Sequence, residues 1–213
     1  MKKLPIEVFS RWAETGKDVG MEEGHKSSVE HMLNYATKDL KQFSFIDAGC
    51  GNGWVVRYIS KLKECKSAIG IDGSLEMIKK AKSLDTVNSY KCDDLIRWIP
   101  ENRVDLVHSM EVFYYFKDPL KLIKHIFNSW LKNKSRLIVG MDFYKENKVS
   151  HSWPEKTGVS IMELISENTW KEYFKESGFK NIKSWKVGKK ENWEGTLIIL
   201  SLIHISEPTR PYW

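Results

Sequence analysis

Short apolar runs alternate along this chain with segments in which apolar residues recur at helical spacing. The apolar runs predict strands at 43–46, 67–71, 86–91, 104–109, 136–141, 179–187 and 194–203. Strands that alternate with helices, and that end in two strands with little between them, are typical of a doubly wound α/β sheet. We therefore expect an α/β fold with a mostly parallel, seven-stranded sheet over residues 41–203.

The segment before the first predicted strand has a helical pattern. Val8, Phe9 and Trp12 supply one apolar face, and 16–24 is interpreted as a polar break between two helices. The second helix is expected to begin at Ser27 or Ser28, since serine is a favoured N-cap. Residues 1–40 are thus predicted to form an N-terminal helical segment.

Composition narrows the class of protein. The 213 residues are 41% hydrophobic and 29% charged, and they contain three cysteines. This length suits one domain, and scattered cysteines predict neither a disulfide framework nor a metal site. Without an apolar run of membrane-spanning length or a signal-peptide core, a cytoplasmic protein with no membrane partner is expected. Neither pattern nor composition decides between a monomer and a homodimer.

The net charge of +6 and the pI near 9 are compatible with a nucleic-acid substrate. However, the lysines are spread over most predicted helices instead of forming one basic stripe. We interpret them as solvated helix faces, which disfavours a nucleic-acid partner.

A glycine-rich turn follows the first strand. Asp47 precedes Gly49, Gly51 and Gly53, and a helical pattern begins directly afterwards. Glycines let the backbone approach a ligand closely, and the N–H groups of a helix start point at the same place. A dinucleotide fold requires G-x-G-x-x-G, but Trp54 occupies the third glycine position. Asp47 would repel a pyrophosphate and suits a ligand with a cationic end.

This turn resembles the first motif of the class I S-adenosylmethionine-dependent methyltransferases, an acidic residue followed by G-x-G-x-G. The resemblance implies a Rossmann-like methyltransferase fold, with the last strand antiparallel, and S-adenosylmethionine as cofactor, with S-adenosylhomocysteine as product. Cys50 then joins Asp47 and the three glycines as a cofactor-binding residue. In this family the N-terminal segment often covers the site, so Trp12, Met21 and His25 are lid candidates; His25 could equally be a surface histidine.

Asp72 follows the second strand and lies 19 residues after Gly53. An α/β sheet places such a carboxylate against ribose hydroxyls, and Gly73 continues this predicted contact; a plain turn aspartate is the alternative. After the third strand come Asp93, Asp94 and Leu95. The resemblance implies that one aspartate accepts a hydrogen bond from the adenine amino group while a backbone N–H reads the ring edge. The choice between the two aspartates stays open.

The fourth strand is followed by Glu111-Val112 and a run of aromatic residues, which resembles the small-molecule branch of the family. The Asn-Pro-Pro-aromatic motif of enzymes that methylate exocyclic amino groups is absent. We expect methyl transfer to an O, N, S or C nucleophile of a small molecule by in-line displacement. His25, Glu111 and His151 are candidate general bases, and Glu111 is alternatively a cofactor-binding residue at the methionine end. The acceptor pocket is expected in 142–165, with Tyr144, His151 and Trp153 as walls.

Three other functions compete with this prediction. An RNA or protein methyltransferase would use the same cofactor site. A nicotinamide oxidoreductase is disfavoured by Trp54 and Asp47. A catalytically inactive cofactor-binding module would have no need to retain both the glycines and Asp72.

The last residues, from Leu200 to Arg210, look like the translation of a sequencing-library adapter. We expect 204–213 to be a non-native tail, and no function is assigned to it.

Overall fold

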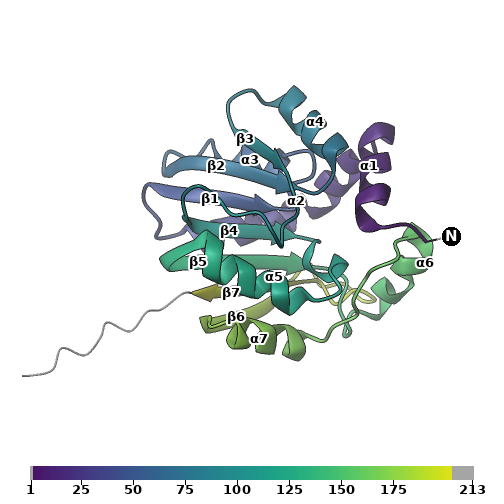
Figure 1. Cartoon of the computed structure of the whole chain (residues 1–213). Coiled ribbons are helices and arrows are strands. Elements are labelled where there is room, and N and C mark those ends of the chain that lie inside the picture. The colour runs from purple at the N-terminus through teal and green to yellow at the C-terminus, as the bar shows by residue number, and fades with distance from the viewer. Residues whose placement is uncertain (1, 203–213) are drawn as a thin grey trace, which may run out of the picture.

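The computed structural model describes residues 2–202 and shows seven strands in one sheet, ordered β3-β2-β1-β4-β5-β7-β6 (Figure 1). The strands are β1 (Phe43–Ala48), β2 (Cys65–Asp72), β3 (Ser89–Cys92), β4 (Val104–Met110), β5 (Leu131–Met141), β6 (Lys180–Val187) and β7 (Thr196–Leu202). Neighbouring strands from β3 to β5 pair in parallel, whereas β7 is antiparallel to both β5 and β6. The predicted fold class and the antiparallel last strand are confirmed.

Helices cover both faces of the sheet (Figure 1). They are α1 (Pro5–Thr15), α2 (Lys17–Thr37), α3 (Trp54–Ile59), α4 (Leu75–Leu84), α5 (Pro119–His125), α6 (Trp153–Thr157) and α7 (Glu167–Glu176). Shorter turns of 3-10 helix span Phe113–Tyr115 and Lys148–Ser152, and a π-helical turn spans Ile126–Trp130. One apolar core joins α2, α3 and α4 to the sheet, and a second joins α5 and α7 to the opposite face.

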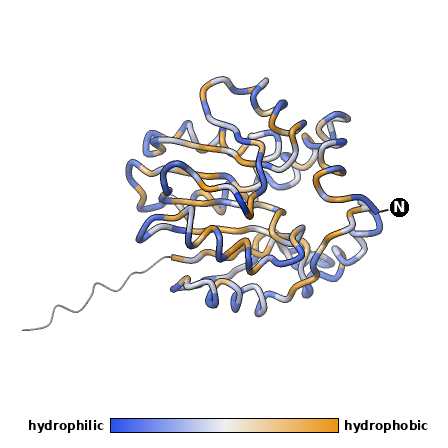
Figure 2. The backbone as a smooth tube through the Cα atoms, viewed as in Figure 1, coloured by the Kyte–Doolittle hydropathy of each residue, from blue (hydrophilic) through white to orange (hydrophobic). Residues whose placement is uncertain are grey.

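Hydrophobic residues follow the central strands, and hydrophilic ones are frequent on the outer helices (Figure 2). Of residues 2–202, none lies in a helix long and apolar enough to span a membrane. The predicted tail at 204–213 falls outside the described residues.

The predicted break between the two N-terminal helices was wrong in extent. Only Gly16 breaks the helix, with a left-handed φ of +77°, and α2 begins at Lys17 with Gly20 and Gly24 inside it. Helix α2 buries Met32 and Leu33 completely against the sheet, and this packing outweighs the weak helix propensity of glycine. Consequently Ser28 is not an N-cap; its hydroxyl instead hydrogen-bonds the Thr196 hydroxyl at 2.8 Å.

Side chains cap the N-termini of three later helices. The Ser74 hydroxyl accepts a hydrogen bond from the Met77 N–H, and the Asp118 carboxylate accepts one from the Lys121 N–H. Ser166 caps α7 in the same way. These caps fix where each helix starts relative to the strand before it.

Candidate functional site

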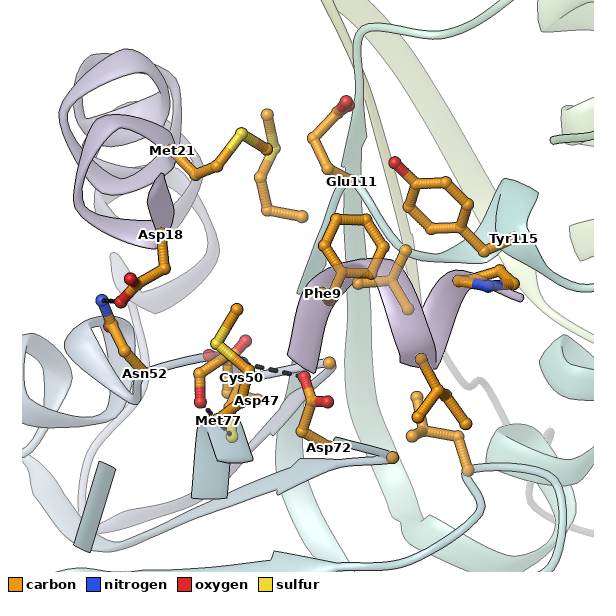
Figure 3. A pocket seen from close by; sticks show the side chains of 18 of the residues that line it. Phe9, Asp18, Met21, Asp47, Cys50, Asn52, Asp72, Met77, Glu111 and Tyr115 are labelled. Atoms are coloured by element: carbon orange, nitrogen blue, oxygen red, sulfur yellow. Dashed lines mark hydrogen bonds between the residues drawn. The ribbon is translucent and has the colours of Figure 1, made fainter. Parts of the chain in front are cut away.

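A cavity of about 630 Å³ lies at the carboxyl ends of β1 to β4, where the strand order reverses between β1 and β4. In doubly wound sheets this reversal is where ligands bind. Residues of the glycine turn line the cavity, and so do apolar side chains of α1 and α2 (Figure 3). Its size falls in the range of small-molecule sites.

The glycine turn is held by backbone hydrogen bonds to β2. The N–H groups of Gly49 and Cys50 both donate to the Ile71 carbonyl, at 2.8 and 3.0 Å. A Cβ on Gly49 would lie 2.3 Å from Val112 Cγ2. This position must therefore be glycine for the turn to pack against the residues that follow β4. At Gly51 the nearest atom to a Cβ would be Met77 Sδ, at 3.9 Å. The turn is therefore tightly packed at Gly49 and open toward the cavity at Gly51.

Asp72 fastens this turn to the end of β2. One carboxylate oxygen accepts a hydrogen bond from the Gly51 N–H at 2.9 Å, and the other accepts one from the Ser74 N–H at 2.8 Å. Burial raises the pKa of Asp72; the two hydrogen bonds oppose this, and the negative charge of Asp47 adds to it. Asp72 thus makes the contacts of a turn aspartate and also lines the cavity, while its contact with a ribose stays a prediction.

Asp47 and His108 form a buried pair that the sequence did not suggest. They are register partners on the parallel strands β1 and β4, and His108 Nδ1 lies 2.7 Å from Asp47 Oδ1. Both line the cavity, and His108 is completely buried. Its Nε2 has no hydrogen-bond partner among the described residues. A histidine directly after Leu106 and Val107, inside the predicted buried strand 104–109, was the available signal.

Asp93, Asp94 and Leu95 follow β3 and all line the same cavity. Asp94 also caps the turn after it, because one of its oxygens accepts a hydrogen bond from the Ile96 N–H at 2.9 Å. Asp93 accepts one from the Asp94 N–H at 2.7 Å. The structure therefore brings both aspartates to the cavity. Cys50 and Gly73 line it as well.

At the other end of the cavity, Glu111 meets His25 and Asp142. Glu111 has a left-handed φ of +60°, which turns the chain out of β4. Its carboxylate accepts hydrogen bonds from the Asp142 N–H and from the Tyr114 hydroxyl. His25 Nε2, from α2, lies 3.4 Å from Asp142 Oδ2, while Asp142 Oδ1 is buried without a partner among the described residues. Potential ligand atoms of the three side chains lie within 4.8 Å of one another.

This clustering changes the acid–base behaviour of both titratable groups that line the cavity here. Burial, with the negative charge of Asp142 adding to it, raises the pKa of Glu111 to about 8. Burial alone would lower the pKa of His25, but its hydrogen bond to Asp142 and the charges of Glu111 and Asp142 outweigh burial and raise it. A carboxyl group with a pKa this high can accept and release a proton near neutral pH.

Three aromatic residues beside this cluster, Phe9, Trp12 and Tyr115, form an aromatic wall of the cavity. Phe9 from α1 makes edge contacts with Trp12 at 5.1 Å and with Tyr115 at 5.0 Å between ring centroids. Figure 3 shows Phe9 and Tyr115 together on the side of the cavity that carries Glu111. Of the predicted lid residues, Trp12, Met21 and His25 all line the cavity.

The structure does not bring the predicted acceptor walls to this cavity. His151 is bonded through Nε2 to the Lys145 carbonyl, Tyr144 donates to the Gly195 carbonyl, and Trp153 stacks on Trp193. From the segment 142–165, Ile161 lines the cavity instead. Two short helices and a bridge between Lys3 and Val159 fold this segment outside the site.

Comparison with known proteins gives a consistent result. A family model described as a methyltransferase domain matches residues 11–184. Protein 235L of Invertebrate iridescent virus 6, which carries a methyltransferase name, is 30% identical over 129 residues, which are 61% of this chain and 45% of that protein. The chain spans about half the length of the curated relatives it matches.

Two solved structures share the fold. A Haloferax volcanii protein solved in complex with the methyltransferase activator Trm112 has a TM-score of 0.77 at 25% identity, over 92% of this chain and 98% of that one. The N-methyltransferase NodS of Bradyrhizobium japonicum, solved with S-adenosylhomocysteine, has a TM-score of 0.65 at 16% identity, over 84% and 86% of the two chains.

Proposed function

Because this chain belongs to the family of methyltransferase domains, we propose that it transfers the methyl group of S-adenosylmethionine to a nucleophile on a small molecule. Its fold is that of the class I S-adenosylmethionine-dependent methyltransferases, and S-adenosylmethionine is its cofactor. The observation that carries the proposed activity is the buried Asp72 carboxylate beside an open glycine turn, at the switch point of the sheet.

The residues present fit this cofactor at both of its ends. The space above Gly51, which a longer side chain would fill, admits the ligand against the backbone. Asp72 and Gly73 are placed to hold the ribose hydroxyls, and Asp93 or Asp94, with Leu95, to hold the adenine. Asp47 and His108, whose Nε2 has no hydrogen-bond partner within residues 2–202, would bind the amino-acid end. When bound, the cofactor supplies an electrophilic methyl group on a sulfonium.

The protein's own contribution is alignment and exclusion of water. Helices α1 and α2 close over the cavity, and the apolar side chains Phe9, Trp12 and Met21 line it. Holding a nucleophile in line with the reacting methyl can supply about 7–11 kcal/mol of barrier reduction. Glu111 is the general base that this geometry favours, because it borders the cavity and its raised pKa suits proton transfer near neutral pH.

Calorimetric binding of S-adenosylhomocysteine tests this function. Replacing Asp72 by alanine removes an acceptor of two backbone hydrogen bonds together with the proposed ribose contact, each worth about 1.5–3 kcal/mol when the acceptor is charged. We expect at least a tenfold loss of affinity in Asp72→Ala, a similar loss in His108→Gln, and no response to NADH. The exposed Asp39→Ala serves as the matched control. Absence of binding to the wild type would contradict the proposal.

A second candidate is methylation of RNA or protein in complex with a small activator. One observation favours it, namely that the Haloferax volcanii protein of the same fold was solved with Trm112. Co-expression with a Trm112-type protein, followed by affinity purification, separates the two. Copurification, with cofactor affinity that depends on the partner, would support the second candidate. Tight binding of S-adenosylhomocysteine by the isolated chain supports the first.

A further inference from the structure

The charge of the cavity is opposite to that of the chain. The protein carries a net charge of +6 with 34 Lys and Arg residues. Yet seven Asp and Glu side chains line the cavity, and among the described residues that line it there is no Lys or Arg. A concave site lined by one sign of charge focuses its field and concentrates ligands of the opposite sign.

The proposed cofactor accounts for only part of this negative charge. Asp47, Asp72, Asp93 and Asp94 surround the glycine turn and belong to that end of the cavity. Asp18 is neutralised by Lys80 at 2.7 Å, and Asp18 and Glu22 both accept a hydrogen bond from the Asn52 amide, at 2.9 and 3.5 Å. The remaining acidic residue, Glu111, lines the far end of the cavity, on the side that carries Phe9 and Tyr115 (Figure 3).

Neighbouring groups leave Glu111 available to a ligand. His25 is the basic side chain beside it, and its Nε2 faces Asp142 at 3.4 Å. Tyr114 and the Asp142 N–H occupy one position on each Glu111 oxygen, and an ionised carboxylate has about four acceptor positions. Tyr115 completes the surroundings through its hydroxyl, 3.4 Å from that of Tyr114.

Building on the proposed methyl transfer, we propose that the acceptor is a small amine whose nitrogen binds Glu111 and whose apolar body packs on Phe9, Trp12 and Tyr115. Aromatic faces attract cations within about 6 Å of the ring centroid, and more strongly when water is excluded. Aromatic rings and a buried carboxylate together therefore select an ammonium over a neutral or anionic group. Acceptors that are carboxylates or phosphates are repelled by the same wall.

Glu111 accepts the proton that the amine must lose before methyl transfer. The amine binds as an ammonium, and its proton passes to the Glu111 carboxylate, which frees the nitrogen lone pair. That lone pair forms the new N–C bond while the sulfonium S–C bond breaks and its electron pair stays on sulfur. Burial raises the pKa of Glu111 to about 8, and the positive charge of a bound ammonium favours the ionised form, which can then accept the proton. The proton leaves Glu111 to solvent as the products depart.

The test compares three probes of the same shape on the wild-type protein loaded with S-adenosylhomocysteine. Phenethylamine, 2-phenylethanol and 3-phenylpropanoate present an ammonium, a hydroxyl and a carboxylate on one aromatic body. We expect phenethylamine to bind at least about tenfold more tightly than the alcohol, and the carboxylate to show no saturable binding. Equal binding of the alcohol, or tighter binding of the carboxylate, would overturn the proposal.

A charge-matched pair of variants locates the contact. In Glu111→Gln, phenethylamine should bind at least about tenfold more weakly while S-adenosylhomocysteine binds as before. The exposed Glu101→Gln should leave both affinities unchanged. Unchanged amine binding in Glu111→Gln would contradict the assignment. Because the probe series uses the wild type, the proposal stays testable if this variant does not fold.

Two further measurements distinguish a failure of the proposed function from a failure of the amine proposal. If the wild type does not bind S-adenosylhomocysteine, the proposed function fails, whereas cofactor binding without amine preference overturns only this inference. The cluster of His25, Glu111 and Asp142 also has metal-ligating atoms. Saturable Mn²⁺ binding that is lost in Glu111→Gln and that competes with phenethylamine would make it a cation site and overturn the amine proposal.

Discussion

The two ends of the cavity are built in different ways. The proposed cofactor end comes from the carboxyl ends of adjacent strands: the glycine turn after β1, Asp72 as the last residue of β2, and Asp93 after β3. Its glycine turn is fixed by hydrogen bonds from the backbone N–H groups of Gly49, Cys50 and Gly51 to Ile71 and Asp72 at the end of β2. The proposed acceptor end pairs side chains of α1 and α2 with residues that follow β4 and β5, such as Phe9 with Tyr115 and His25 with Asp142, which are more than a hundred residues apart in the chain.

This difference determines what each end can tolerate. A backbone cradle depends on individual glycines, because an added Cβ meets its neighbours at once. An end built from side chains on separate elements depends instead on charge and on how those elements pack. Substitutions at the proposed cofactor end should therefore weaken binding by steric clash. Substitutions at the proposed acceptor end should act by changing protonation or the docking of α1 and α2.

The largest effect is expected from Gly49→Ala. Its Cβ would lie 2.3 Å from Val112 Cγ2, at a φ of +78° that side chains rarely adopt. Strain of this kind costs about 1–3 kcal/mol, in addition to overpacking of similar size. We expect a loss of S-adenosylhomocysteine affinity of at least about thirtyfold by calorimetry, and a lower melting temperature.

Gly24→Ala is the matched control, since it lies inside α2 with nothing within 4 Å of the added Cβ. It should raise stability by up to about 1 kcal/mol, because alanine favours helix. If both variants bind the cofactor like the wild type, the cradle does not depend on Gly49 and the steric argument is wrong.

A smaller effect is expected from pH at the acceptor end. The pKa values of Glu111 and His25 are raised in the folded protein, so the folded state holds these protons more tightly than the unfolded chain. The stability that each group contributes is present below its unfolded pKa and lost as the pH rises through its folded pKa. For Glu111 that window runs from about 4.5 to about 8.

Calorimetric melting temperatures between pH 5 and 9 should therefore fall with rising pH, by at least the roughly 2 °C that 1 kcal/mol produces in a chain of this size. Glu111→Gln should flatten this slope, and Glu101→Gln should keep it. A wild-type melting temperature that rises across this window would contradict the raised pKa of Glu111 and the argument that this pKa suits proton transfer near neutral pH.

The smallest effect concerns the docking of α1. The hydroxyls of Ser10 and Ser74 lie 2.8 Å apart and tie α1 to the start of α4. Losing one such hydrogen bond costs about 0.5–1.5 kcal/mol. In Ser10→Ala, amide hydrogen exchange over 5–15 should accelerate about two- to tenfold, while Ser67→Ala on β2 should leave it unchanged. Unchanged exchange in Ser10→Ala would mean that apolar contacts alone hold the helix.

That Asp47, Gly49, Gly51 and Asp72 lie together at one end of the cavity could be predicted from the sequence, because the signal is local. Asp47, the three glycines and Asp72 each follow an apolar run that predicts a strand, and the carboxyl ends of parallel strands meet at one edge. Local spacing therefore placed these residues together before any tertiary contact was known. The fold class was available for the same reason, since alternating strand and helix patterns restrict the topology.

Only the tertiary structure decided the acceptor end. Asp142 lies next to residues that seemed suited to form a pocket, yet the segment after it folds away and α1 supplies the aromatic wall instead. The pairing of Asp47 with His108 depends on strand register, and α2 is helical from Lys17 because its far end is buried against the sheet. Contacts between distant segments carry no local signal in the chain, because they arise from packing and not from spacing.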